Sequence, residues 1–405
     1  MFLYSNVCIS ENGLPQQGKI KFGFPVYLCS MLWVETIHQR ITKAVKPQDE
    51  VKLRFDALTG LRWLAASMVF VYHNRKYWRG AVPKPVLLFM NEFDLGVAVF
   101  FVLSGFLIAW TYGSKPMHSK TDYLKYFLLR AARILPLYWL ILTARYVDYG
   151  LPKNGEGWFT YTLFQGFSGR HNLDAIAQSW TLSVEMTFYL LAPLLFFLWN
   201  KSIYRVLFFL LLAGTLAALT GYVWHKINGN PQQILYPFSL VQGATFFGRF
   251  PEFLAGMWLA RKLQTTGIQA PSTFRFKTSA GLLGLIISTY LLALCEPDIF
   301  SHGSDSWMGK IIFYTLIPFF ITLFIYGLIV EKTLIQRFFS LKVMVLLGNA
   351  SYAFYLIHIS YVNIRLRGWY LGPDRNYILL WIIAILLYLL FEKPVYAFIR
   401  RKLYS

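Results

Sequence analysis

Long apolar segments recur along the chain between about residue 61 and residue 398, and short polar segments separate them. A helix needs about 20 mostly apolar residues to cross the hydrocarbon core of a bilayer. The pattern therefore predicts an all-α, polytopic membrane protein with about ten transmembrane helices. The predicted helices cover residues 61–78, 95–112, 127–147, 180–199, 204–224, 240–260, 279–295, 310–330, 343–364 and 377–398.

The two ends of the chain differ from this pattern. In residues 1–52 the apolar run from Phe24 to Trp33 is too short to span a membrane, and no small-residue cleavage site of a secretory signal follows it. We therefore expect an N-terminal extension at 1–52, interfacial or poorly ordered, and one transmembrane domain at 53–405. Near the other end, Glu392-Lys393-Pro394 and the basic tail predict a helix stop at the inner membrane surface.

Composition and charge agree with a membrane protein. Hydrophobic residues make up 56% of the chain and charged residues 14%, and the net charge is +20. Most Lys and Arg fall on one side of the predicted helices, together with both termini, which places the termini in the cytoplasm. We expect a multi-pass protein of the cell (inner or plasma) membrane. Nucleic-acid binding is not expected, because no recognition motif accompanies the charge.

The cysteines give no sign of a metal site or of a disulfide framework. Cys8, Cys29 and Cys295 lie far apart and have no C-x-x-C spacing. We expect no bound metal.

Two ionisable residues share one face of the first predicted helix. His73 lies eleven positions after Arg62, about three helical turns or 16 Å. With a cytoplasmic N-terminus, Arg62 is expected at the inner rim and His73 in the outer half. Because buried charges are costly in a bilayer, the pair predicts a polar interior track. The alternative is an Arg that reaches to the rim and a His that hydrogen-bonds to a neighbouring helix.

A carboxylate lies at a depth comparable with that of His73. The fourth predicted helix begins near Trp180, which places Glu185 about 7 Å below the outer rim. A general base and the group that orients it need this arrangement. A structural ion pair that locks two helices is the alternative.

Two arginines follow one another at the inner surface. Arg130 and Arg133 are three residues apart, on one face of the third predicted helix, and two guanidinium groups so placed suit a phosphate or pyrophosphate. A topology signal or contact with anionic lipids are the alternatives. In the second predicted helix, Ser104-Gly105 is a pair of small residues among bulky ones, and close helix packing is enough to explain Gly105.

Two further groups are candidates for substrate binding, together with Trp180. Arg249 and Glu252 flank Pro251, and a proline within a membrane helix often lines a cavity; an internal i, i+3 ion pair is the alternative. In the ninth predicted helix, Ser351, Tyr355 and His358 share one face and Tyr352 lies beside it, where ordinary packing is the alternative.

The largest outer segment, at about 148–178, is expected to cover a sugar with aromatic and polar side chains. These side chains are Trp158, Tyr161, Gln165, Arg170 and His171.

Six of these stretches, in the same order, resemble the acyltransferase 3 family of integral membrane O-acyltransferases. The resemblance covers roughly residues 54 to 400. Its motifs are Arg54-Phe-Asp56-Ala-Leu-Thr-Gly60-Leu-Arg62 leading to His73, Phe101-Val-Leu-Ser104-Gly105-Phe106, Arg130-Ala-Ala-Arg133-Ile-Leu-Pro136, Trp180-Thr-Leu-Ser183-Val-Glu185, Arg249-Phe-Pro-Glu252-Phe-Leu-Ala-Gly256 and Gly348-Asn-Ala-Ser351-Tyr352-Ala-Phe-Tyr355-Leu-Ile-His358.

The resemblance implies transfer of an acyl group, most often acetyl, from cytoplasmic acyl-CoA to a hydroxyl acceptor. The acceptor is commonly an envelope glycan such as lipopolysaccharide or another polysaccharide. By position, His73 would be catalytic with Glu185 in support, and Arg62, Arg130 and Arg133 would lie on the donor side. The chain departs from the family in its N-terminal extension, and no soluble hydrolase-like domain follows the last helix, so transfer through such a domain would need a separate partner.

We therefore expect His73 to deprotonate an acceptor hydroxyl that enters from the outer side, so that the alkoxide attacks the thioester of acetyl-CoA. Ser104, on the donor side, and Tyr355 are candidates for hydrogen bonds to the oxyanion. The alternative is a proton-coupled transporter or flippase of a glycan or small molecule, in which His73, Glu185 and Arg249 form a proton relay. The acceptor and the oligomeric state stay open.

Overall fold

The computed structural model describes residues 47–114, 117, 119–152, 156–268, 276–296, 298, 301–367 and 372–404, without the side chains of 47–54 and 367. Residues 1–46 lie outside the described residues, and with them most of the predicted N-terminal extension. Lys52–Ser405 forms one compact unit.

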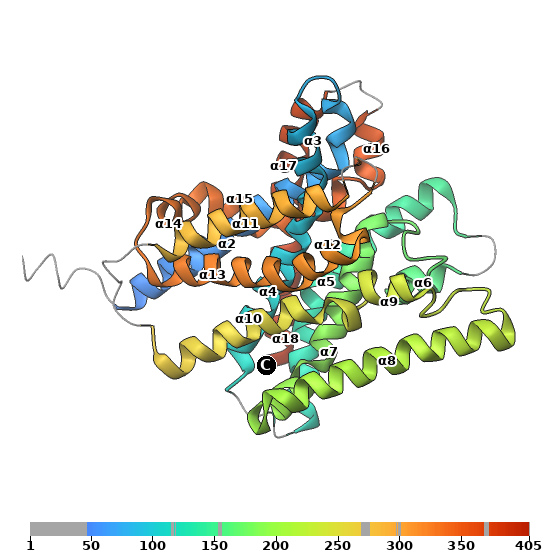
Figure 1. Cartoon of the computed structure of the whole chain (residues 1–405), viewed down its shortest axis with the longest axis horizontal. Coiled ribbons are helices and arrows are strands. Elements are labelled where there is room, and N and C mark those ends of the chain that lie inside the picture. The colour runs from blue at the N-terminus through green and yellow to red at the C-terminus, as the bar shows by residue number, and fades with distance from the viewer. Residues whose placement is uncertain are drawn as a thin grey trace, which may run out of the picture. The chain divides into compact units, whose positions relative to one another are not determined.

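All regular elements among the described residues are helices, and each of the ten predicted segments falls on one to three consecutive helical elements (Figure 1). The all-α fold is confirmed. The helices are α2 (Pro47–Asn74), α4 (Gly96–Tyr112), α5 (Lys120–Tyr149), α7 (Trp180–Lys201), α8 (Ile203–Asn228), α10 (Phe246–Thr266), α11 (Lys277–Cys295), α12 (Trp307–Ile311) with α13 (Ile317–Val330), α15 (Lys342–Ile357), and α17 (Pro373–Leu387) with α18 (Lys393–Tyr404).

Within the described parts of the chain, seven helices are long and apolar enough to cross a membrane. The other three predicted helices are present but shorter or more polar: α15 has 16 residues, α2 contains Arg62, and α10 contains Arg249 and Glu252. The protein is therefore a multi-pass membrane protein. Its surface agrees, because α8 exposes a row of large apolar side chains that includes Phe208 and Leu211.

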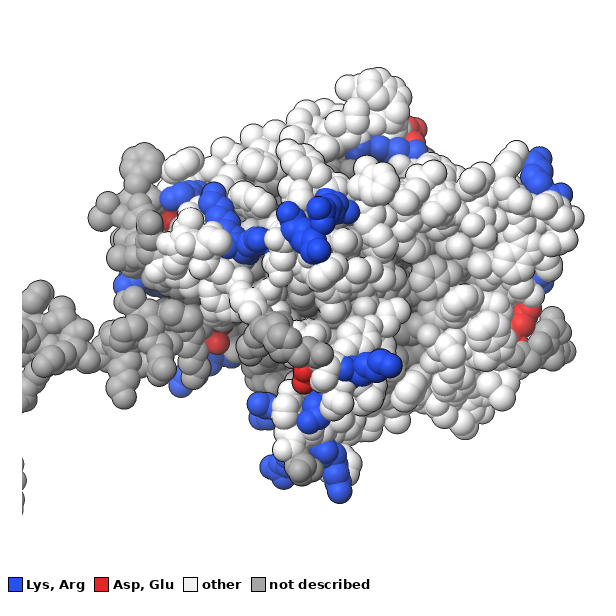
Figure 2. All heavy atoms as spheres, turned by 90° about the horizontal axis from the view of Figure 1, so that it is seen from below, with Lys and Arg blue, Asp and Glu red and all other residues white. Residues whose placement is uncertain are grey.

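Broad areas of the protein surface that the structure describes carry no charged side chains. On the face shown in Figure 2, such areas are extensive, and the charged side chains that do appear are mostly Lys and Arg. This distribution is typical of a protein whose apolar belt contacts lipid.

Short helices join the long ones: α3 (Lys84–Asn91), α6 (Gly157–Tyr161), α9 (Phe238–Ala244), α14 (Leu334–Phe339) and α16 (Tyr361–Arg367). We call the end of the bundle that holds the α4–α5, α7–α8 and α10–α11 connections the inner end, because the charge pattern predicts that it faces the cytoplasm. The opposite end is the outer end.

Glycines allow α4 and α10 to pack closely, side by side in Figure 1. A Cβ at Gly105 would lie 2.2 Å from the carbonyl oxygen of Phe253, and a Cβ at Gly256 would lie 2.0 Å from that of Val102. Each glycine therefore contacts the backbone of the other helix. The prediction that packing explains Gly105 is confirmed.

The predicted helix stop at Glu392-Lys393-Pro394 is wrong. The chain continues from α17 through a π-helical turn, Tyr388–Glu392, into α18. Pro394 is the second residue of α18, just after the π-helical turn, where the wider turn accommodates its missing N–H group. Glu392 is consequently buried within the bundle instead of lying at its surface.

Candidate functional site

Arg62 lies among the other charged side chains of the bundle, and its expected position at the inner membrane rim stays a prediction. It stands near the middle of α2, and its guanidinium interacts electrostatically with Glu185, Arg133 and Glu392. Its Nε is inaccessible to solvent. The helix extends further toward the inner end than the hydrophobic pattern indicated, because α2 begins at Pro47.

Glu185 joins three helices in the middle of the bundle. Its Oε1 accepts hydrogen bonds from the hydroxyls of Ser104 on α4, at 2.7 Å, and of Tyr189 one turn further along α7. Arg62 of α2 provides the nearby positive charge. These contacts hold the carboxylate in one orientation, since it accepts two hydrogen bonds on one oxygen.

Arg130 and Arg133 line the inner part of the same polar region. The guanidinium of Arg130 lies 5.0 Å from the ring centre of Tyr112, at the end of α4, and interacts electrostatically with Tyr189. Arg133 interacts with Arg62 and with the buried Glu392. The two arginines therefore lie between the inner end and Glu185, as a site for an anionic ligand requires.

At the outer end, His73 lies against the stripe predicted on α15. The ring centres of His73 and His358 are 5.2 Å apart, and those of His358 and Tyr355 are 5.4 Å apart. The hydroxyl of Tyr355 shares a 3.0 Å hydrogen bond with Thr181. The outer end of the predicted stripe, at His358, therefore contacts His73. The support of His73 by Glu185 stays a prediction, because the hydrogen bonds of Glu185 run to Ser104 and Tyr189.

A narrow cavity of about 40 Å³ connects the two groups. It is lined by residues of both, including Arg62, Glu185 and Tyr355. Phe100, which also lines it, lies between the guanidinium of Arg62, at 5.8 Å, and the ring of Tyr355, at 5.9 Å. We call the series from Arg130 and Arg133 through Arg62 and Glu185 to Tyr355, His358 and His73 the polar track.

Arg249 and Glu252 form the ion pair that was the alternative for this segment. Arg249 Nε donates to Glu252 Oε1 at 2.7 Å, and both side chains are buried. The guanidinium also lies 6.0 Å from the ring centre of Trp180 and 5.2 Å from that of Phe101. Arg249 Nη2 and Glu252 Oε2 have no hydrogen-bond partner among the described residues. Binding of substrate by this pair stays a prediction.

Three side chains at the outer end stand close enough to share a metal ion. Glu92, Asp94 and His302 place one ligand atom each within 4.8 Å of the others. The hydroxyl of Tyr72, the neighbour of His73, lies 3.0 Å from His302 Nε2. Carboxylates and imidazole are ordinary ligands of divalent metals, but ion pairing explains the same arrangement.

In the outer segment at about 148–178, which was expected to cover a sugar, two of the candidate side chains form hydrogen bonds within the protein. Gln165 is buried and donates to Ser179, and His171 lies 2.7 Å from Asp174 Oδ2 and 2.6 Å from Gln232 Oε1. Neither side chain faces outward, whereas Trp158 is 52% exposed.

Both ring nitrogens of His171 face oxygen acceptors, which favours the doubly protonated form. Burial lowers the pKa of His171, but the hydrogen bonds to Asp174 and Gln232 and the charges of Asp174 and Glu156 outweigh it and raise the pKa above its ordinary value.

Comparison with known proteins identifies the family. The model of a protein family described as acyltransferase domain (Acyl_transf_3) matches residues 55–392. The chain belongs to the acyltransferase 3 family. The match runs through all the helices that build the polar track and ends at Glu392.

The chain is also similar to two curated proteins. The acyltransferase MdmB of Streptomyces mycarofaciens is 27% identical over 354 residues, which cover 80% of this chain and 84% of the relative. The O-acetyltransferase OatA of Staphylococcus aureus is 25% identical over 368 residues, 84% of this chain but 56% of the relative. The chain thus spans little more than half the length of OatA. No solved structure matches the chain.

The structure adds three residues that the sequence reasoning missed. Tyr112 lies under Arg130, Tyr189 donates to Glu185, and Glu392 lies near Arg133 and Arg62. The i, i+4 spacing of Glu185 and Tyr189 was a usable signal. Glu392 had none, because its sequence context is that of a helix end.

Proposed function

We propose that this acyltransferase 3 protein transfers an acetyl group from cytoplasmic acetyl-CoA to a hydroxyl of an envelope or exported glycan. The observation that carries the proposal is the polar track. In its middle a cavity is lined by Arg62, Glu185 and Tyr355; Arg133 interacts with Arg62 on one side, and on the other the ring of His358 lies between those of Tyr355 and His73. Buried ionisable groups are costly in a bilayer, so a function for them is the default expectation.

The relatives support the choice of acyl group. OatA is named an O-acetyltransferase and MdmB an acyltransferase. Acetyl is also the smallest common acyl group, which suits a cavity of about 40 Å³ near Glu185.

In the proposed reaction, Arg130 and Arg133 bind the phosphates of the donor and its thioester arm enters the polar track. His73 accepts the proton of the acceptor hydroxyl, and the oxygen bonds to the thioester carbonyl. The carbon–sulfur bond then breaks, and the departing thiolate takes the proton back from His73. The ring of His358, 5.2 Å from His73, limits the orientations that the imidazole can adopt.

Glu185 has a separate role in this scheme. Its carboxylate accepts hydrogen bonds from two hydroxyl groups in the middle of the polar track. It therefore keeps Ser104 and Tyr189 fixed and balances the charge of Arg62. Its hydrogen bonds to Ser104 and Tyr189 favour this positioning role over direct support of His73.

The test uses the full chain purified into lipid nanodiscs, with acetyl-CoA and no ion gradient. We expect consumption of acetyl-CoA when glycan acceptor is present, and mass spectrometry of surface glycans should show acetylation that depends on the gene. His73→Ala should abolish both, whereas His225→Ala should leave both unchanged, because His225 stacks on Tyr236 away from the polar track. An unchanged rate in His73→Ala would overturn the proposal. Solute movement that requires a gradient, without acetyl-CoA consumption, would favour the transporter instead.

A further inference from the structure

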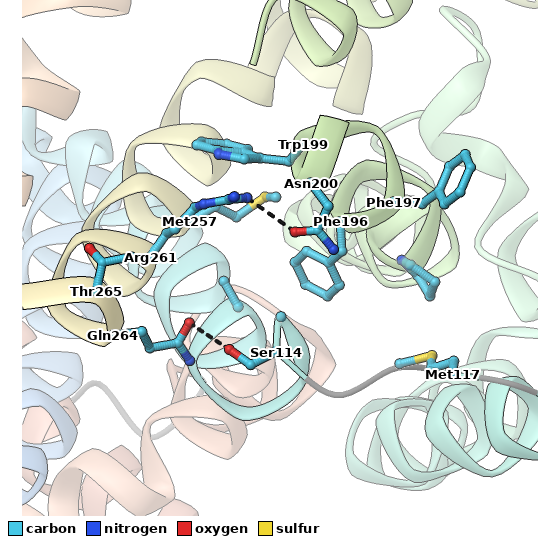
Figure 3. A pocket seen from close by; sticks show the side chains of 13 residues that line it. Ser114, Met117, Phe196, Phe197, Trp199, Asn200, Met257, Arg261, Gln264 and Thr265 are labelled. Atoms are coloured by element: carbon cyan, nitrogen blue, oxygen red, sulfur yellow. Dashed lines mark hydrogen bonds between the residues drawn. The ribbon is translucent and has the colours of Figure 1, made fainter. Parts of the chain in front are cut away.

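A second, larger cavity opens at the inner end, between the last turns of α4, α7 and α10 (Figure 3). Its volume is about 560 Å³, within the range of about 300–1,000 Å³ that small-molecule sites occupy. None of the residues assigned above to the polar track lines it. Its walls include Ser114 of the α4 end, Phe196, Trp199 and Asn200 of α7, and Arg261 and Gln264 of α10.

The lining combines aromatic surfaces with amides and one cation. Phe196 and Trp199 offer faces on which a planar base can stack. Asn200 and Gln264 carry amide groups, and Figure 3 shows both at the edge of the cavity, where Asn200 accepts from Arg261 at 3.2 Å and Gln264 accepts from Ser114 at 3.1 Å. Arg261 is the guanidinium of the cavity and suits a phosphate group.

The C-terminal ends of three helices favour the base of a nucleotide over its phosphate at their side of the cavity. α4, α7 and α10 all reach the cavity with their C-terminal ends, whose last carbonyl groups lack partners within the helix. These carbonyls can accept hydrogen bonds from the amino group of a base, and their negative dipole ends disfavour phosphate. A phosphate in the cavity therefore has to contact the exposed Arg261.

The cavity adjoins the donor side of the polar track along α4. Gly113, in its wall, follows Tyr112, whose ring contacts Arg130. Ala109, also in the wall, stands five residues from Ser104, about 7 Å along the helix. A ligand held in the cavity can thus place phosphates near Arg130 and extend a thin arm toward Glu185.

We propose that this cavity binds the adenosine 3′-phosphate end of the CoA donor, with the base on Trp199 and Phe196 and the 3′-phosphate on Arg261. The proposal rests on the proposed function and deepens it. Arg130 and Arg133 then contact the pyrophosphate of CoA. The adenosine 3′-phosphate and the pyrophosphate that carries the pantetheine arm are therefore bound by different side chains.

The test measures binding of three ligands to the full chain in nanodiscs: CoA, 3′-dephospho-CoA and 4′-phosphopantetheine, which lacks the nucleotide. Trp199→Ala removes the stacking surface and should raise the Kd of CoA and of dephospho-CoA about tenfold. Arg261→Ala should raise the Kd of CoA about tenfold and leave that of dephospho-CoA unchanged. Neither variant should change the Kd of 4′-phosphopantetheine, which also reports that the variant is folded.

Two control variants share the chemistry but not the cavity. Trp258→Ala lies on α10 and faces a different cavity, and Arg205→Ala lies near the start of α8, exposed and at the same end of the bundle. Both should bind all three ligands like the wild type. Trp199→Phe and Arg261→Lys, which keep a ring and a charge, should recover part of the lost affinity.

The outcomes separate the two proposals. If the wild type binds no CoA, the proposed function fails. If it binds CoA but Trp199→Ala and Arg261→Ala bind it equally well, only the nucleotide site is overturned. An equal loss of affinity for all three ligands also overturns the nucleotide site. That result is expected of a cavity that only supports the fold or holds a lipid headgroup, since such a cavity does not distinguish CoA from dephospho-CoA.

Discussion

The α4–α10 contact offers a sharp test of the fold, through the substitution Gly256→Ala. An ideal Cβ at Gly256 lies 2.0 Å from the carbonyl oxygen of Val102 and 2.6 Å from the amide nitrogen of Phe106. Both atoms belong to the backbone of α4, so no side chain can rotate to make room. The two helices have to separate locally by about 1 Å to reach the 3.0 Å below which such contacts essentially never occur.

Two terms of opposite sign determine the size of the effect. Overpacking of a well-packed interior costs about 1–3 kcal/mol, whereas alanine is favoured over glycine within a helix by up to about 1 kcal/mol. Gly214→Ala on α8 reports the second term alone, because its added Cβ meets nothing closer than 3.5 Å. The difference between the two variants therefore isolates the cost of overpacking. We therefore expect Gly256→Ala to be less stable than Gly214→Ala by about 1–3 kcal/mol.

The assay is thermal or denaturant unfolding of the wild type and both variants in the same detergent. Gly256→Ala should unfold several degrees below Gly214→Ala, which should equal or exceed the wild type. Equal stability of the two variants would show that α4 and α10 do not pack through Gly256. Gly105→Ala, whose Cβ would lie 2.2 Å from the carbonyl oxygen of Phe253, should behave like Gly256→Ala.

Three further substitutions test the buried polar groups. Glu252→Leu leaves the buried Arg249 without its counter-ion and should lower the free energy of unfolding by about 3–5 kcal/mol, and Arg249→Met in the same chain should restore most of it; additive losses would contradict the ion pair. Ser104→Ala removes a hydrogen bond to a carboxylate and should lower kcat about tenfold or more at unchanged affinity for CoA, so an unchanged kcat would exclude a role in the reaction. The pKa of His171 is raised in the folded state, so protonated His171 stabilises the fold. This contribution to the free energy of unfolding is complete below about pH 6.5, the pKa of a His in the unfolded chain, and is lost as the pH rises through the pKa of the folded state. Proteolysis of the outer segment should therefore increase over that range in the wild type but not in His171→Gln.

Hydrophobic periodicity was enough to predict the helices and much of their packing. Each predicted segment is helical, since an apolar run of this length in a membrane has no other stable backbone conformation. The shared face of Tyr355 and His358 followed from helical geometry in the same way, and so did the close approach at Gly105. These features depend on one helix and its residue types.

Features that depend on two helices could not be predicted from the pattern. The partners of Glu185 are a hydroxyl on α4 and one on its own helix, and nothing in the sequence indicates which face of α4 meets α7. The extent of α2 before Arg62 was missed for a related reason. The polar residues before it resemble a loop, yet they continue α2 well beyond the apolar segment.

The wrong prediction of a helix end at Glu392 also concealed a charged group beside the polar track. A Glu-Lys-Pro sequence before a basic tail is typical of a helix end in water, but here the helix continues and carries the carboxylate to Arg133 and Arg62. Three positive charges, those of Arg62, Arg130 and Arg133, then meet two carboxylates, those of Glu185 and Glu392, in the middle of the bundle. This leaves an excess of positive charge, which a buried region tolerates only when an anion is near. The phosphates of a CoA donor meet that requirement, so the bundle is expected to be more stable with CoA bound than without it.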